Sequence, residues 1–405
     1  MSTSLLYHAF GVRGYVYQRT DYYGGALYIW VQQEPETRRC AACGSRDVVG
    51  RGTEKRSFRA LPIGKRPVTI VLPVPRVECH ACGVVRQVPI PFARPRCSYT
   101  PSFRRYALDL CRHMTMQDVA DHLGVGWDMI KEMQARDLQR RFGRPKLKHL
   151  QQIAIDEIAV ARGHRYLTVV LDLESGCVVF VGEGKGANAL KPFWKRLRAA
   201  HARVRAVAMD MSLAYIAAVL DNLPKALIVF DRFHIMKLYN EKLSDLRRAL
   251  QREAEDRMHK TVLKGTRWLL LKNPENLDEK RGERERLAEA LRLNAPLATA
   301  YYLKEDLRQI WEQPDKATAR RVLKDWIARA AISGIRVLQK FAQTLQAYRN
   351  SILAWYDYPI STGPLEGTNN KIKTMKRQAY GFRDLQFFKL KILAIHECDY
   401  ALLNS

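Results

Sequence analysis

The sequence contains no long apolar run and no repeated or low-complexity segment. No uninterrupted apolar stretch approaches the roughly 20 residues that a membrane-spanning helix requires. A secretory leader has a basic segment followed by an apolar one. The N-terminal residues do not show this pattern. The absence of a fixed period excludes solenoids and propellers. We therefore expect a protein that contacts no membrane and stays in the cytoplasm.

Acidic residues are scarce relative to basic ones. The 405 residues include 68 Lys and Arg against 41 Asp and Glu, which gives a formal net charge of +27. A positive field of this size attracts anionic polymers such as nucleic acids. The 47% hydrophobic content excludes a disordered basic tail, because it supplies enough apolar surface for folded cores. At about 150 residues per domain, the length predicts several domains.

Two cysteine knuckles, each followed by glycine, flank a segment of short apolar runs. Their four cysteines are Cys40, Cys43, Cys79 and Cys82. The runs between Ser57 and Glu78 predict a small β-hairpin that brings the knuckles together. Four thiolates suit a structural Zn²⁺ ion, because they leave no coordination position open. The alternatives are a redox pair or ordinary buried cysteines, and we interpret His80 as a neighbour of the site rather than a ligand.

A helical period follows, from Ser102 to Phe142, and predicts three short helices. Within it, Ala120, Gly124 and Ile130 stand where a helix-turn-helix needs a small contact residue, a turn and an apolar anchor. The alternative is an ordinary two-helix hairpin in a core. The candidate DNA-binding residues of this module are Arg104, Arg105, Trp127, Lys131, Arg136, Arg140 and Arg141.

Five apolar runs then predict strands, with helical stretches before the fourth and the fifth. The runs are Ile153–Ile155, Tyr166–Leu171, Cys177–Val181, Val204–Met209 and Ala226–Phe230. The order β-β-β-α-β-α-β indicates a mixed sheet in an α/β fold. From Phe233 to Tyr356 the pattern is helical throughout, and another helical region follows from Gly363. We interpret Trp311, Trp326 and Trp355 as core residues rather than as base-stacking ones.

Three acidic residues stand out against this pattern. Asp156 follows the first strand, and Asp210 ends the fourth. Glu366 lies in Thr-Gly-Pro-Leu-Glu-Gly-Thr-Asn-Asn-Lys, close to a helix start. Carboxylates gathered in this way would bind Mg²⁺, whereas each aspartate alone would serve as a turn or helix cap. The basic residues that follow Glu366 are candidate DNA contacts: Lys371, Lys373, Lys376 and Arg377.

With these residues in view, the chain resembles the DDE transposases, and more narrowly the bacterial insertion-sequence transposases of the ISL-three group. The resemblance rests on the double knuckle, the helix-turn-helix, Asp231-Arg-Phe-His234-Ile-Met-Lys and Gly363-Pro-Leu-Glu366-Gly-Thr-Asn-Asn-Lys-Ile-Lys. It implies an RNase H-like core interrupted by an all-α insertion. It also implies that Asp156, Asp210 and Glu366 are the catalytic ligands of Mg²⁺ or Mn²⁺.

The pair Asp231 and His234 is similar to an Asp-x-x-His element of several eukaryotic DDE superfamilies. That similarity implies support of the active site. The residues themselves allow a plainer interpretation, in which Asp231 caps the helix that begins near Arg232. In both cases the pair should lie at the same sheet edge as Asp210, because parallel strands end on one side.

The expected domains follow from these boundaries. They are a zinc-binding β module over residues 1–98, a helix-turn-helix domain with linker over 99–148, the first part of the core over 149–232, the insertion over 233–358 and the last part of the core over 359–405.

The resemblance implies a DNA transposase that binds the terminal inverted repeats of an insertion sequence and target DNA. It implies metal-dependent phosphodiester hydrolysis and strand transfer by a homo-oligomer, in the simplest case a dimer on double-stranded DNA, at the nucleoid of a bacterial cytoplasm. Two alternatives remain open. One is a DNA-binding regulator with an inactive core, and the other is a metal-dependent nuclease without strand transfer.

Overall fold

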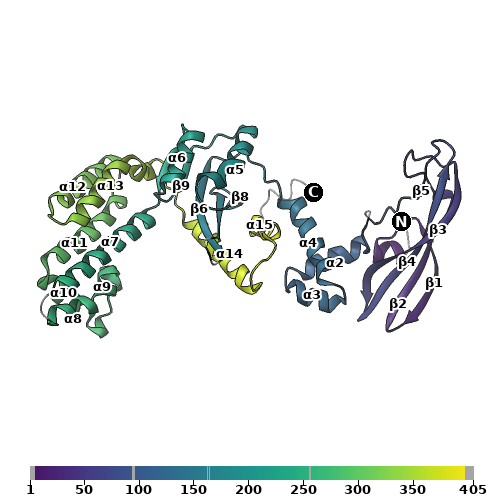
Figure 1. Ribbon diagram of the computed structural model, residues 1–405, viewed down its shortest axis with the longest axis horizontal. Coiled ribbons are helices and arrows are strands. Elements are labelled where there is room, and N and C mark those ends of the chain that lie inside the picture. Colours follow the sequence, from purple (N-terminus) through teal and green to yellow (C-terminus); the bar gives the residue numbers. More distant parts are fainter. Residues whose placement is uncertain (1–4, 94–95, 162, 164, 255–256, 397–405) are drawn as a thin grey trace. The chain divides into compact units, whose positions relative to one another are not determined.

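The computed structural model describes residues 5–93, 96–161, 163, 165–254 and 257–396 (Figure 1). The chain divides into two compact units, Met1–Arg140 and Arg141–Ser405, each of which is described by itself. Among the described helices, none is long and apolar enough to cross a membrane.

The first unit begins with a short helix and a five-stranded sheet. The elements are α1 (Leu5–Phe10), β1 (Tyr15–Tyr23), β2 (Ala26–Gln33), the 3-10 turn Pro35–Thr37, β3 (Val48–Ile63), β4 (Arg66–Cys79) and β5 (Val85–Gln87). The order is β1-β2-β4-β3, with β5 paired to β4. The predicted hairpin is confirmed as β3–β4, and both strands extend beyond the expected runs.

The β1–β2 hairpin was not predicted from the sequence. Its loop is Gly24-Gly25, with φ of 55° and 76°. Only glycine adopts two successive positive φ angles at no steric cost, and a two-residue loop of this kind matches the twist of paired strands. One face of the sheet buries Ile29, Phe58 and Ile70 in a core that α1 covers.

Three helices complete the first unit. They are α2 (Pro101–Leu110), α3 (Met116–Leu123) and α4 (Trp127–Phe142). Thr115 and Asp118 form a reciprocal capping box at the start of α3. Gly124 ends α3 in the left-handed conformation, with φ of 59°, and Ile130 is fully buried behind the turn. The predicted helices are confirmed, although α4 has 16 residues and is not short.

The second unit is built on another five-stranded sheet. Its strands are β6 (Gln152–Ala161), β7 (Arg165–Asp172), β8 (Val178–Glu183), β9 (Ala206–Met209) and β10 (Leu227–Phe230), in the order β10-β9-β6-β7-β8. β6, β9 and β10 are parallel neighbours, whereas β7 and β8 are antiparallel additions. The predicted mixed sheet and its strand order along the chain are therefore confirmed.

Helices cover both faces of this sheet (Figure 1). On one face, Ile153 and Ile155 pack with residues of α5 (Ala187–Ala199) and α6 (Leu213–Asn222). On the opposite face, Ala154 and Ile158 pack with residues of α14 (Gly363–Gln378) and α15 (Leu385–Leu393). Successive residues of a strand point to opposite faces of the sheet. In β6, odd-numbered residues therefore meet α5 and α6, and even-numbered residues meet α14 and α15.

Helices also make up the described residues between Arg232 and Tyr356. They are α7 (Arg232–Glu253), α8 (Arg257–Gly265), α9 (Arg267–Leu271), α10 (Glu283–Leu293), α11 (Ala295–Arg308), α12 (Lys316–Ile332) and α13 (Arg336–Leu353), with 3-10 turns at Pro274–Asn276, Glu279–Arg281, Gln309–Trp311 and Ala354–Tyr356. Trp311 and Trp326 are buried and Trp355 is half-buried against the core, which confirms their interpretation as packing residues.

Candidate active site and DNA-binding elements

The four cysteines of the knuckles form one compact cluster. The Sγ atoms of Cys40 and Cys82 are 3.6 Å apart, and those of Cys43 and Cys79 are 3.5 Å apart. A tetrahedron with metal–sulfur bonds of 2.3 Å has edges of about 3.8 Å, so the spacing fits Zn²⁺. His80 lies outside the cluster, with its Nδ1 3.5 Å from a carboxylate oxygen of Asp47. Its interpretation as a neighbour is confirmed.

Three aspartates lie level with one another across the parallel strands of the second sheet. Ala154 pairs with Ala208, and Phe230 pairs with Met209. Continuing these registers by one or two residues places Asp156, Asp210 and Asp231 in one row. Each of these aspartates comes two residues after a strand residue that is buried on the face covered by α14. By parity, all three carboxylates belong to that face of the sheet.

The position of Asp156 differs from the sequence prediction. It lies inside β6 and not at the end of a strand, because β6 continues to Ala161 through its pairing with β7 alone. The pairing of β6 with β9 ends at Ala154. Beyond that point one edge of β6 has no strand neighbour among the described residues, so Asp156 still lies where the parallel sheet opens.

The environment of Asp156 disfavours its charge. Burial raises the pKa of this carboxyl, and the nearby Asp210 and Glu157 charges add to the effect. The backbone N–H of Glu157, which donates at 2.8 Å, and His234 act in the opposite direction. Neither Asp156 nor Asp210 pairs with a Lys or Arg within the described part of the chain. Two close carboxylates without such a partner are a suitable place for a cation.

Asp231 connects two segments that are far apart in the sequence. One carboxylate oxygen accepts the N–H of Phe233 at 2.8 Å, so the predicted helix cap is confirmed. The other oxygen accepts the N–H of Thr362 at 2.7 Å and its hydroxyl at 2.6 Å. Asp231 and Thr362 are 5% and 2% exposed. A buried charge with three donors thus holds the start of α14 against the start of α7.

Asn369 makes a second connection between α14 and the sheet. Its amide nitrogen donates to Asp156 at 2.8 Å. Glu366 precedes Asn369 by three residues and therefore lies one turn away on a similar face of α14. Neither Thr362 nor Asn369 was predicted from the sequence, although both belong to the motif that contains Glu366. Asn369 follows Glu366 by three residues, the spacing of neighbouring side chains on a helix, and this spacing would have identified it.

The structure does not bring the three proposed catalytic acids within one ligand sphere. In the described residues, only the four cysteines form a group of three or more potential ligands with donor atoms within 4.8 Å of one another. Asp156 and Asp210 are half-buried and electrostatically close, whereas Glu366 is exposed in the first turn of α14.

The candidate DNA-binding residues fall into two sets. Those of the first unit lie on α2 and α4, where Arg136 and Arg140 bond to the acids of their own helix and the ammonium of Lys131 lies 5.5 Å from the ring centroid of Trp127. Those of the second unit lie on α14. Lys371, Lys373 and Arg377 are exposed there, and Lys376 is half-buried.

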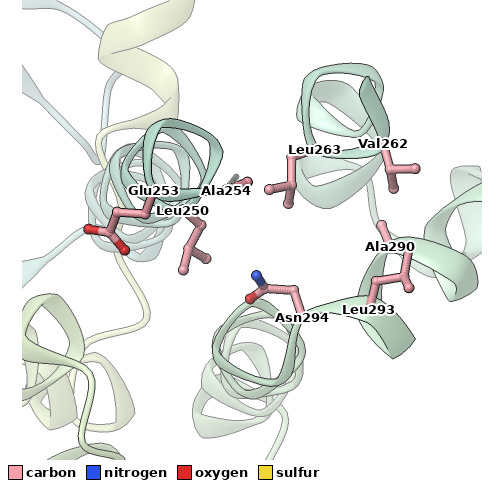
Figure 2. A pocket seen from close by; sticks show the side chains of 8 residues that line it. All are labelled: Leu250, Glu253, Ala254, Val262, Leu263, Ala290, Leu293 and Asn294. Carbon is pink, nitrogen blue, oxygen red and sulfur yellow. The ribbon is translucent and has the colours of Figure 1, made fainter. Parts of the chain in front are cut away.

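Two cavities occur in the helical part of the second unit. The first has a volume of about 220 Å³ and is lined by residues of α7, α8, α10 and the start of α11. Figure 2 shows Leu250, Leu263 and Asn294 pointing toward it, whereas the carboxylate of Glu253 points away. Its lining is mainly apolar, so we interpret it as a packing gap. The second cavity, of about 400 Å³, lies along α7 next to Asp231.

Three family models match the chain. A DDE transposase model of the ISL3 type matches residues 153–392. The helix-turn-helix domain of transposase family ISL3 matches residues 88–136. The zinc finger of the transposases of IS204, IS1001, IS1096 and IS1165 matches residues 36–82. The matched ranges contain the row of aspartates, the cysteine cluster and the helix-turn-helix.

Individual relatives match over most of their length. The transposase for insertion sequence element IS1001 of Bordetella parapertussis is 34% identical over 95% of this chain and 96% of its own. The transposase for IS1557 of Mycobacterium tuberculosis is 30% identical over 86% and 83%. A solved Drosophila P element transposase strand transfer complex is 13% identical, with a TM-score of 0.37, over 73% of this chain and 92% of that one.

Proposed function

The chain belongs to the ISL3 family of transposases and is a DNA transposase of the DDE type, and from this premise we propose which residues carry out the reaction. Asp156, Asp210 and Glu366 are the catalytic acids. The zinc module and the helix-turn-helix recognise the terminal inverted repeats of the insertion sequence. The second unit hydrolyses a phosphodiester there and joins the freed end to target DNA.

The observation that carries this proposal is the attachment of α14 to the row of aspartates. Asp231 holds Thr362 at the start of α14, and Asp156 accepts a hydrogen bond from Asn369 one turn after Glu366. Glu366 lies between these two attachments. A helix held at both points keeps Glu366 on the side of the sheet that carries Asp156 and Asp210, and its side chain would have to turn toward them to complete the set.

The donor atoms suit Mg²⁺ or Mn²⁺. Carboxylate oxygens are hard ligands, and within the described residues none of the three acids pairs with Lys or Arg. Bound there, the ions would stabilise the charge that develops on phosphate oxygens during attack and departure. The exposed Lys371, Lys373 and Arg377 of the same helix would hold the neighbouring phosphates of the DNA.

The folds of the parts support the same proposal. A mixed sheet with β6, β9 and β10 in parallel and acids on its α14 face agrees with an RNase H-like core. The helices from α7 to α13 would then be an all-α insertion between its second and third catalytic acids. We propose the domain boundaries given above, a dimer on double-stranded DNA as the working form, and the bacterial nucleoid as the place of action.

The proposal is tested by Asp156→Asn, Asp210→Asn and Glu366→Gln in the full-length protein. Each variant should lose cleavage and strand transfer on labelled terminal DNA in Mg²⁺ and Mn²⁺, while it still binds that DNA. The melting temperature should stay equal or rise slightly, because neutral side chains repel one another less than clustered carboxylates do. Full cleavage by any variant would remove that residue from the active site.

The same assay separates the two alternatives. A wild-type protein that binds terminal DNA but never cuts it would be a regulator. A protein that cuts but never joins the freed 3′-OH to a target would be a nuclease.

A further inference from the structure

A groove runs along α7 from the end of the aspartate row. Its lining includes Phe233, Lys237, Asn240, Ser244, Arg248 and Arg267, and its volume is about 400 Å³. We propose that this groove binds one unpaired strand of DNA, with Phe233 stacked on a base and with Lys237 and Arg267 on phosphates. This inference rests on the proposed function, because it assigns the groove to the DNA end on which the acids act.

Phe233, the first residue of the groove along α7, is connected to the aspartate row through its backbone. The N–H of Phe233 donates to Asp231, the buried aspartate that also holds α14. The ring of Phe233 meets that of His234 edge to face, at 5.5 Å between centroids. His234 is close enough to Asp156 to affect the charge of that carboxyl. A base on Phe233 would therefore lie beside the proposed catalytic acids.

Phe233 is available to a ligand. Its side chain is 51% exposed, although it belongs to the first turn of a helix that buries Ile235 and Tyr239 completely. A large exposed aromatic ring held by a helix cap is a rigid platform. Every nucleobase has a flat face, so stacking of this kind accepts any sequence.

The charge of the groove suits a phosphate backbone. Lys237 and Arg267 are exposed, and in the described residues Lys237 makes no ion pair. The Arg267 guanidinium lies 4.6 Å from the ring centroid of Trp268, which is itself 64% exposed. Glu241 is the one acid among the lining residues, and Arg248 is bonded to Asp245 at 2.7 Å.

The dimensions favour a single strand. Phe233, Lys237, Asn240, Ser244 and Arg248 recur at helical spacing along one side of α7, over about 22 Å at 1.5 Å per residue. A positive groove with an aromatic ring at one end is the usual form of a site for unpaired DNA. A volume of this size has room for part of one strand and is too small for a duplex.

The test uses the full-length protein in Mg²⁺-free buffer and two probes. One is a 20-base-pair duplex of random sequence with a single-stranded extension of five thymines, of which the second is 5-iodouracil. The other is the same duplex with blunt ends. The variants are Phe233→Ala, Phe233→Trp and the pair Lys237→Ala with Arg267→Ala. Matched controls on exposed residues of the same helical part are Tyr302→Ala and the pair Arg320→Ala with Lys324→Ala.

We expect at least fivefold tighter binding of the extended probe and a photo-crosslink to the peptide that contains Phe233. Phe233→Ala should abolish both, and Phe233→Trp should retain both. The loss of two phosphate contacts to a single strand should lower the slope of log Kd against log salt by about 1.4, whereas the control pair should leave it unchanged.

Equal affinity of the wild-type protein for both probes would overturn the inference, and so would a preference that survives the groove substitutions. Crosslinks confined to residues 1–140 would also overturn it. Because this buffer prevents metal-dependent chemistry, the result is independent of the cleavage assay. If the protein prefers the extended probe but never cleaves DNA, the proposed function is wrong, whereas the assignment of the groove to single-stranded DNA stands.

Discussion

At the scale of single residues, Asp231 has the most demanding role outside the proposed catalytic set. Its two oxygens accept from three donors, and two of these belong to Thr362, which lies 131 residues from Asp231 in the chain. No local pattern predicts a contact at that separation. The sequence suggested a cap or an active-site element, and the structure shows how one side chain can cap α7 and also hold α14 in place.

Asp231→Asn should therefore weaken both folding and cleavage. An amide has one oxygen, so in either orientation its NH₂ group faces a backbone N–H, of Phe233 or of Thr362. Loss of a buried, charged hydrogen bond costs about 1–3 kcal/mol of the free energy of unfolding. Cleavage, assayed well below the melting temperature, should fall because Glu366 loses its fixed position, while the affinity for terminal DNA stays the same.

The control is Asp315→Ala, which removes another helix cap in the same unit. Asp315 caps α12 through the N–H groups of Ala317 and Thr318. This variant should lose stability and keep full cleavage. Equal loss of cleavage in both variants would show that Asp231 acts on the fold alone.

At the scale of elements, the sequence predicted those whose residues are buried on both faces or follow a clear helical period. β7 to β10 and α2 to α6 were found in this way. The β1–β2 hairpin was missed because β1 is mostly exposed and carries polar and tyrosine side chains, so no apolar run marks that strand. The apolar run Ala26–Val31 and the Gly24-Gly25 loop were the signals that would have identified the hairpin.

The candidate site was also predictable only where local rules apply. The cysteines follow the pattern of knuckles and Asp210 follows a strand end, whereas Asp156 was expected at a strand end and lies inside β6. The row of aspartates needs the register between β6, β9 and β10, and the role of Asn369 needs the packing of α14. Those are tertiary facts, which a local pattern does not contain.

The knuckles of β3 and β4 give a prediction for the zinc module. The protein purified without added metal should contain one Zn²⁺ per chain, and Cys79→Ala should contain almost none. Because the ion links the two knuckles, its loss should loosen the end of the β3–β4 hairpin and lower the melting temperature of the first unit. The control is Cys111→Ala, which lies on no knuckle.

Atomic absorption and thermal melts of both variants decide the matter. A Cys79→Ala protein with full zinc content would show that the ion binds elsewhere.

At the scale of the whole molecule, the helix-turn-helix match and the transposase match lie in separate compact units, to which we assign recognition and chemistry. Removal of residues 1–142 should abolish the preference for terminal over random DNA. Weak general binding should remain, because basic residues of the second unit still release counterions from phosphates. Competition binding at several salt concentrations measures both effects. A truncated protein that still discriminates terminal DNA would place specificity in the second unit.

The division into two units also means that the first unit is synthesised before the second. Glu366 follows the last residue of the first unit by 226 positions. Ribosomes add roughly 5–20 residues per second, so about 11–45 s pass between the two. During that interval the first unit can fold on the nascent chain and find DNA, while the carboxylate set of the second unit is still incomplete. We therefore expect each new molecule to be able to bind DNA before it is able to cut it.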